Sequence, residues 1–237
     1  MNYNWSWSIF GQPSLDGVHT FLESILIGTG WTLALALCAW IFALGLGLFF
    51  GIGRTVPNKA VRLLSGIYVE FFRGIPLLVQ MFLWYFVMPE LIPSQMGNAV
   101  KGLPAPWAQF FPALICLSLY QGAHVTEIVR SGVQSVGRGQ KNAAVAMGFS
   151  FAQVYRYVIL PQAFRLVVPP LTSQMMSTVK SSSVAMTIGL LELTGAARSM
   201  QEFSFHVFEA FSAATLIYLV LNVTVVQSVR RLDRLHH

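Results

Sequence analysis

The chain has 237 residues, of which 55% are hydrophobic and only 10% are charged, and its formal net charge is +6. Soluble domains usually carry about 25% charged residues, so this composition excludes an ordinary soluble domain and indicates an integral membrane protein. The positive charge does not require a nucleic-acid partner, because membrane proteins gather Lys and Arg in their cytoplasmic loops. Cys38 and Cys116 lie in apolar runs, where we expect buried thiols rather than a disulfide.

The N-terminal segment, residues 1–17, has neither the basic region nor the apolar core of a cleaved signal peptide. We expect the first membrane span to act as an uncleaved targeting signal. Trp5 and Trp7 are of a residue type that prefers the membrane–water interface, so we expect them at the membrane surface.

Five stretches are predicted to cross the membrane as helices, because a hydrocarbon core needs about 20 predominantly apolar residues. They cover about residues 25–52, 61–87, 110–133, a stretch that begins near 161, and 208–229. Lys and Arg cluster at the ends of the first, third and last spans, which predicts an N-terminus outside and a cytoplasmic C-terminus. The expected fold is therefore all-α, with residues 1–237 as one transmembrane domain. Residues 89–106 and 194–206 are expected to be exterior segments, and residues 185–193 a short apolar segment.

Small and charged residues within these spans suggest contacts between helices. Gly47 and Gly51 form a GxxxG pattern, which permits close helix packing. Glu127 and Arg130, near the end of the third span, are three residues apart and can pair on one helical face. His124 is assigned no role.

The second span is interrupted by the sequence EFFRGIP. Glu70 and Arg73 are three residues apart and can meet on one helical face, and Gly74 and Pro76 then break or kink the helix. An ionisable pair at membrane depth usually faces a bundle interior or an aqueous path. A place on a translocation path and a structural ion pair near the cytoplasmic end both stay open.

The fourth span is the least apolar. It contains Pro169 and Pro170 and then TSQMMSTVKSSSVAMT, which has too many polar groups for a helix that faces lipid. Lys180 is the deepest cation, so a translocation path is the first hypothesis and a structural role the alternative. The candidate path or gate residues are Glu70, Arg73, Lys180, Ser181, Ser182, Ser183 and Thr187. A cation and hydroxyl groups could hold the oxygens of a carboxylate.

Residues 139–161 form a polar, basic interruption between the third and fourth spans. Ala143, Ala144 and Met147 fit on or near one face of a short helix, and Gly148 stands where a left-handed C-terminal glycine is expected. Pro161 would then occupy the first turn of the next helix. Such a helix–glycine–helix element is a shape that another protein could grip; an ordinary loop is the alternative.

The chain lacks the sequence patterns of common catalytic and metal sites. GxxxxGK[ST], HExxH, paired cysteines and GxSxG are all absent from the sequence. We therefore expect neither an enzyme nor a metal protein, but a chain that moves a solute with energy from an ion gradient or from another subunit.

The stretch GQKNAAVAMGFSFAQVYRYVILP resembles the cytoplasmic signature, or EAA loop, of binding-protein-dependent ABC importer permeases. FFRGIPLLVQ and VKSSSVAMTIGLLELTGAA resemble segments of the polar amino acid permeases, and the resemblance covers about residues 20–228. Further stretches, among them YVEFFRGIPLLVQMFLWYFVMPELIP, look most like a permease subunit of the glutamate/aspartate importer. Asn142 stands where the signature usually has its first Glu, so coupling through that carboxylate is not expected.

This resemblance implies a type I ABC importer transmembrane domain in a bacterial inner membrane. It implies a second permease subunit, commonly a homologous but different chain, a periplasmic solute-binding protein, and two cytoplasmic ATPase subunits that bind ATP and Mg²⁺; no cofactor is expected on this chain. The coupling loop, about residues 137–160, would dock into the ATPase through Gln140, Lys141, Asn142, Ala143, Ala144, Met147 and Gly148. The implied cargo is glutamate or aspartate. Glutamine, histidine or arginine, and a gradient-driven secondary transporter, stay as alternatives.

Overall fold

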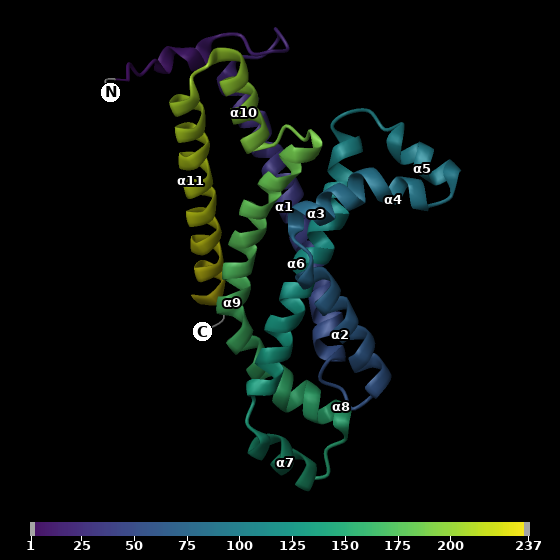
Figure 1. Ribbon diagram of the computed structural model, residues 1–237. Helices are drawn as coiled ribbons and strands as arrows, with labels where there is room; N and C mark the ends of the chain where they lie inside the picture. The colour runs from purple at the N-terminus through teal and green to yellow at the C-terminus, as the bar shows by residue number, and fades with distance from the viewer. Residues whose placement is uncertain (1–2, 235–237) are drawn as a thin grey trace. The chain divides into compact units, whose positions relative to one another are not determined.

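The computed structural model describes residues 3–234, and this part of the chain is helical apart from turns, loops and one isolated bridge between Pro13 and Thr20. The prediction of an all-α chain is confirmed (Figure 1). In chain order the elements, with η for 3-10 and π turns, are η1 (Trp7–Gly11), α1 (Phe21–Gly53), α2 (Lys59–Gly74), α3 (Leu77–Phe82), η2 (Leu83–Val87), α4 (Met88–Leu91), α5 (Ser94–Lys101), α6 (Trp107–Ser135), α7 (Arg138–Ala146), α8 (Phe151–Val154), η3 (Tyr155–Ile159), α9 (Leu160–Ser181), η4 (Ser182–Ile188), α10 (Leu193–Ser204) and α11 (Val207–Arg234).

Two helices of the described chain are long and apolar enough to cross a membrane: α1, and α11 over Val207–Val229. A third span results if α2 and the helical run Leu77–Leu91 are counted together, although they are bent by 100° relative to one another. The bend falls at Ile75 and Pro76, where EFFRGIP predicted it, because proline lacks the N–H that would continue the helix. Five crossings and the orientation of the termini stay predictions.

The fourth predicted span differs from its expectation at its start. Helix α8, the π turn η3 and α9 form one uninterrupted helical run, so Pro161 lies well inside a helix rather than in its first turn. The wider π turn directly before Pro161 relieves the clash that a proline ring makes with the preceding turn. Helix α9 also continues through Pro169 and Pro170.

The described residues divide into two compact units. The second unit comprises Trp40–Pro76 and Ser118–Met175, and the first unit comprises the others. In the first unit, one apolar cluster joins Leu35 of α1, Met81 of α3 and Cys116 of α6. Both thiols are free, and Cys116 is buried as predicted, whereas the prediction of a buried thiol is wrong for Cys38, which is half-buried.

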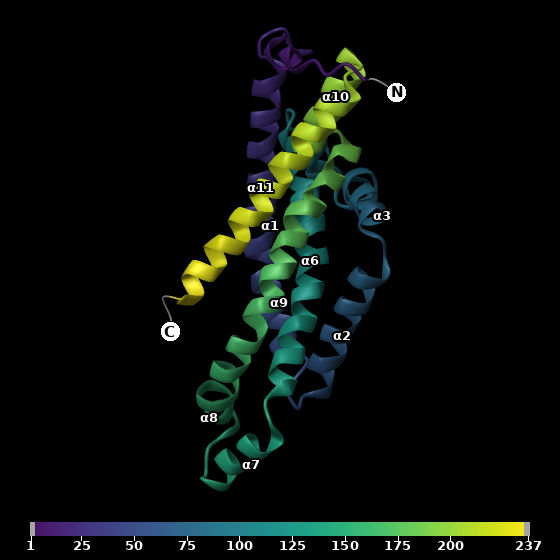
Figure 2. The same cartoon turned by 90° about the vertical axis from the view of Figure 1, so that its left-hand side faces the viewer.

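The segment predicted as a polar exterior stretch is helix α10. Its residues Leu193, Ala196, Ala197 and Met200 recur with helical spacing and pack into a second cluster of the first unit, against α1 and α11. Figures 1 and 2 both show α10 and α11 side by side. The polar residues between these positions hide the pattern in the sequence.

The GxxxG pattern of α1 is a contact with α6 inside the second unit. A Cβ atom added at Gly47 would lie 2.2 Å from Cγ1 of Val125, and one added at Gly51 would lie 2.7 Å from Cβ of Val129. Only a hydrogen on the α-carbon fits at these two positions. The close packing that the pattern predicted is therefore confirmed.

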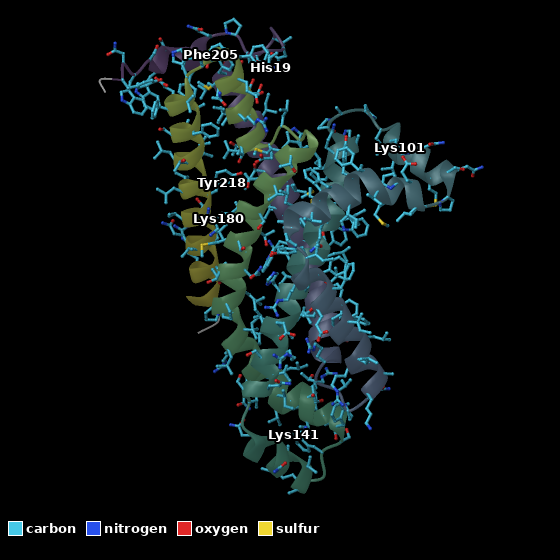
Figure 3. All side chains as sticks on the ribbon, viewed as in Figure 1. His19, Lys101, Lys141, Lys180, Phe205 and Tyr218 are labelled. Atoms are coloured by element: carbon cyan, nitrogen blue, oxygen red, sulfur yellow. The ribbon has the colours of Figure 1, made fainter. Side chains whose placement is uncertain are left out.

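The segment 89–106, predicted as an exterior loop, contains helices α4 and α5. These two short helices pack on one another, and an ion pair joins Glu90 to Lys101 across them. Lys101 is labelled in Figure 3.

Candidate functional site

Helix α7 and the residues that follow it form the predicted helix–glycine element. Gly148 has φ +85°, in the left-handed region. Its N–H donates to the carbonyl of Val145 at 2.9 Å, and the N–H of Phe149 donates to the carbonyl of Ala144 at 3.2 Å. This is a complete Schellman motif, so the predicted position of Gly148 as a left-handed glycine at the end of a helix is confirmed.

Helix α8 begins immediately after this turn. The hydroxyl of Ser150 accepts from the N–H of Gln153, and the side-chain oxygen of Gln153 accepts from the N–H of Ser150 at 2.8 Å. This reciprocal capping box satisfies donors that the helix start leaves open. Because both helix ends are capped, the connection between α7 and α8 has a defined shape.

Ala144 lies in the interior of the second unit. It is 1% exposed and packs in a cluster with Val133 of α6, Val154 of α8, and Tyr155 and Ile159 of η3. Its side chain is therefore not placed to make the partner contact that the sequence suggested. Helical periodicity groups Ala144 with Met147, but it cannot tell which of them the chain itself covers.

An apolar surface remains exposed around the turn. Val145 is 56% exposed, Met147 68%, Phe149 36% and Phe151 45%; these four residues are the α7–α8 surface. The other predicted coupling residues, Gln140, Lys141, Asn142 and Ala143, are also exposed. Figure 3 labels Lys141 on this helix. Clustered exposed apolar side chains are typical of a protein contact site. The sequence prediction missed Val145, Phe149 and Phe151.

A cluster of charges lies in the second unit, where α1 ends beside α6. One carboxylate oxygen of Glu127 accepts from Arg54, and the other accepts from Nη2 of Arg130 at 2.8 Å and from its Nε at 3.0 Å. Hydrogen bonds between two charged groups are among the stronger hydrogen bonds in proteins. The predicted Glu127–Arg130 pair is confirmed. The contact between Arg54 and Glu127 was not predicted, because no local spacing relates these two residues.

Glu70 and Arg73 do not form the predicted pair. Both side chains are exposed, and none of the ion pairs in the described chain joins them. Arg73 forms no ion pair with Glu127 of α6 either. Two exposed side chains three residues apart gain little from pairing, because solvent screens the attraction and pairing restricts both side chains.

Lys180, like Arg73, is a cation of the predicted path without an ion-pair partner among the described residues. Its side chain is exposed. The hydroxyls of Ser182, Ser183 and Thr187 each donate to the backbone carbonyl three residues earlier, at 2.7–2.8 Å. They keep only acceptor capacity, which suits a carboxylate poorly, so Lys180 is the better anion ligand of this segment. Ser181 is half-buried.

The predicted path residues are divided between the two units. Lys180, Ser181 to Ser183 and Thr187 belong to the first unit, and Glu70 and Arg73 belong to the second. Each group is accordingly a separate candidate.

Glu192 is a buried acid for which no role was predicted. Its carboxylate accepts from the N–H of Thr194 at 3.0 Å and of Gly195 at 2.9 Å, and so caps α10. It also accepts from the hydroxyls of Thr32 of α1, at 3.1 Å, and Tyr218 of α11, at 2.9 Å. The local signal was an acid directly before a helix, but its partners on α1 and α11 are distant in sequence. Tyr218 is labelled in Figure 3.

No group of three or more His, Cys, Asp or Glu side chains in the described residues could hold a metal ion. The geometry instead offers an exposed apolar turn, a charge cluster and an uncompensated lysine. An exposed apolar turn can contact a partner protein, and an exposed lysine can bind an anion.

Comparison with known proteins points the same way. Residues 43–235 match the family described as the binding-protein-dependent transport system inner membrane component. The glutamate/aspartate import permease protein GltJ of Escherichia coli K12 is 46% identical over 235 residues, which are 99% of this chain and 96% of GltJ. The probable amino-acid ABC transporter permease protein PatM of Vibrio harveyi is 35% identical over 83% of this chain and 84% of its own length.

Solved structures share the fold. A crystal structure of an amino acid ABC transporter with histidines matches with a TM-score of 0.76 and 30% identity, over 90% of this chain and 94% of that chain. The MetNI methionine ABC transporter in an inward-facing conformation matches with a TM-score of 0.73 over 90% and 96% of the two chains. Its 19% identity makes that likeness one of fold alone.

Proposed function

The chain belongs to the family of binding-protein-dependent transport system inner membrane components, and from this premise we propose that it carries glutamate and aspartate in an ATP-driven importer. It is a permease subunit of an amino-acid ABC importer in the inner membrane, not an enzyme, and it has the type I importer fold; the family prediction is confirmed.

The observation that carries the cargo assignment is the identity of 46% to the glutamate/aspartate permease across almost the whole of both chains. A glutamine transport permease of Escherichia coli, GlnP, is 32% identical over a shorter stretch. The uncompensated charge of Lys180 is compatible with an acidic cargo, because a cation donates charge-assisted hydrogen bonds to carboxylates.

The α7–α8 surface is the proposed contact with an ATPase subunit. Met147 and Val145 project from a capped turn of defined shape, and Ala144 anchors that turn inside the second unit. Two ATPase subunits would bind ATP and Mg²⁺ and move towards one another. The contacts of Tyr155 and Ala144 would transmit this movement to the second unit of this chain. Packed elements with two discrete arrangements are a common way to transmit such a motion. A second, homologous permease and a periplasmic binding protein complete the proposed assembly.

Uptake into proteoliposomes tests the cargo and the energy source together. The chain is assembled with the second permease, the ATPase and the binding protein, and uptake of radiolabelled glutamate and aspartate is compared with that of glutamine, histidine and arginine. We expect glutamate and aspartate to enter only with enclosed ATP, and ionophores to have no effect. Preferred uptake of another amino acid overturns the cargo. Uptake that does not depend on ATP but is lost when the ion gradient is dissipated overturns the ATP-driven mechanism.

A further inference from the structure

The N-terminal segment is fastened to the start of α11 within the first unit. The carboxylate of Glu209 has no exposed surface and accepts from the hydroxyl of Tyr3 and, at 2.7 Å, from the N–H of Ser6. Ile9 of η1 is 3% exposed and packs into the cluster that contains Ala210 and Ala214 of α11. The hydrogen bonds to Glu209, which we call the polar latch, and the burial of Ile9 thus hold the segment in one place.

One side of this segment is a row of aromatic rings that contact one another. The rings of Trp5 and Trp7 lie 5.3 Å apart and nearly parallel, those of Trp7 and Phe10 lie 5.9 Å apart, and Tyr3 contacts Phe208 at 4.5 Å. We call these five residues the aromatic strip. Trp5, Trp7 and Phe208 are 51%, 52% and 55% exposed. Large aromatic side chains left half exposed and preordered by one another present a surface that needs a partner.

The other side of the segment is polar but uncharged. The hydroxyls of Ser6 and Ser8 lie 3.2 Å apart, and residues 3–13 contain no Lys, Arg, Asp, Glu or His. A short segment with aromatic rings on one side and hydroxyls on the other is suited to lie flat in the interface between the hydrocarbon core and water.

The strip continues into a surface of α11 whose exposed apolar side chains are typical of a helix that contacts lipid. A shallow groove runs from Trp5 and Trp7 along Phe208 and Phe211 to Leu216 of α11. Helix α11 is apolar over Val207–Val229, and few of its side chains in that span are buried in the chain. Tryptophan and tyrosine concentrate where such a span leaves the hydrocarbon. The aromatic strip lies at the N-terminal end of this apolar span, where that preference applies.

We propose that residues 3–11 are an in-plane membrane anchor whose aromatic strip inserts into the phospholipid interface beside α11. Ser6 and Ser8 face the headgroups and water. Through its bonds to Tyr3 and Ser6, Glu209 fixes the depth of α11 relative to that interface. The anchor depends on neither the cargo nor the energy source.

Photo-crosslinking of the assembled transporter in its native membrane tests the anchor. Benzoyl-phenylalanine is placed singly at position 5, 7 or 8, with position 219 of α11, where Leu219 is 60% exposed, as the lipid-facing reference. After irradiation, mass spectrometry identifies adducts on the peptide. We expect phospholipid adducts at positions 5, 7 and 219, and several-fold fewer at position 8 on the polar side of the same turn.

Three results overturn the proposal. Adducts at positions 5 and 7 with another protein, such as the binding protein or the second permease, identify the strip as a protein contact. Absence of adducts at these positions while position 219 reacts places the strip in water. Equal yields of lipid adducts at positions 7 and 8 show that the turn does not direct one side towards lipid, as the anchor requires.

The latch has a separate test. Glu209→Ala in the variant with benzoyl-phenylalanine at position 7 should lower the lipid yield, because Tyr3 and Ser6 lose their acceptor. Glu209→Gln keeps a side-chain oxygen for the N–H of Ser6 and should restore part of the yield. Glu202→Ala, which removes only an exposed ion pair with Arg198, is the matched control. An unchanged yield in Glu209→Ala refutes the latch.

Discussion

The hydroxyl of Tyr155 donates a 2.9 Å hydrogen bond to the backbone carbonyl of Thr55. Tyr155 begins η3, directly after α8, and Thr55 follows the last turn of α1. The same ring is 8% exposed and packs against Ala144 of α7. A displacement of α7 can therefore reach the end of α1 through one side chain, without passing along the sequence between them.

Tyr155→Phe keeps the ring and removes this hydrogen bond. The variant should fold and bind the ATPase, because a hydrogen bond of this kind contributes only about 1 kcal/mol. The amount of amino acid imported per ATP hydrolysed should fall, since α1 is less firmly tied to η3. Parallel measurement of uptake and phosphate release in proteoliposomes gives this ratio. Tyr157→Phe, whose ring is 61% exposed, is the control. A wild-type ratio in Tyr155→Phe means that the bond transmits nothing.

Met147→Asp tests the α7–α8 surface without disturbing the interior. Met147 is 68% exposed, so the substitution should leave the melting temperature unchanged and weaken co-purification of the ATPase. Ala144→Asp should instead lower the melting temperature, because it buries an unpaired carboxylate. Leu91→Asp, at a position 72% exposed in the α4–α5 region, controls for loss of surface apolarity. Full ATPase recovery with Met147→Asp rules this surface out as the contact.

The contrast between these two residues shows what the sequence could predict. The left-handed glycine at 148 and the helix break before Pro76 follow from local chemistry and were predictable. The separation of Ala144 from Met147 depends on the end of α6, which covers one and not the other. The contact between Arg54 and Glu127 and the buried contacts of Glu192 also join distant segments, so no local spacing could reveal them. Helix α10 was missed because polar residues interrupt its apolar stripe.

Gly47→Leu should destabilise the second unit through the contact between α1 and α6. Its new Cβ would lie 2.2 Å from Val125, and overpacking of this kind typically costs about 1–3 kcal/mol. Gly45→Leu places the same side chain where a Cβ would meet nothing within 4 Å, and should be tolerated. Thermal unfolding of both variants in detergent provides the comparison. Equal melting temperatures would show that α1 can move away from α6 without loss of thermal stability.

The turn before α1 should be most stable in mildly acidic solution. A hydrogen bond from the backbone of His19, together with one from its ring at 2.6 Å, lowers the pKa of Asp16, and the same carboxylate raises the pKa of His19. The contribution of Asp16 is complete above about pH 3.9 and is lost as the pH falls through its lowered value. The contribution of His19 is complete below about pH 6.5 and is lost as the pH rises through its raised value. The optimum therefore lies between about pH 4 and 6.5.

Hydrogen exchange of the amides of Val18 and His19, which donate to Asp16 at 3.0 Å, reports on this turn. Their protection factors, corrected for intrinsic exchange, should decline above the optimum. Asp16→Asn keeps an acceptor oxygen but removes the charge, so it should abolish the decline that His19 causes. A decline of the same size in Asp16→Asn would assign it to other groups.

Lys180→Ala should impair passage of the cargo and leave assembly intact. Lys180 is exposed and forms no ion pair in the described chain, so its removal leaves no buried charge unpaired. A hydrogen bond to a charged group contributes about 1.5–3 kcal/mol, which corresponds to a roughly tenfold or larger loss of uptake. Lys180→Arg keeps the charge and should retain most of the activity. Binding-protein affinity and ATPase co-purification are measured beside uptake. If the ATPase is lost together with uptake, Lys180 is a structural residue; if uptake persists, it lies off the path.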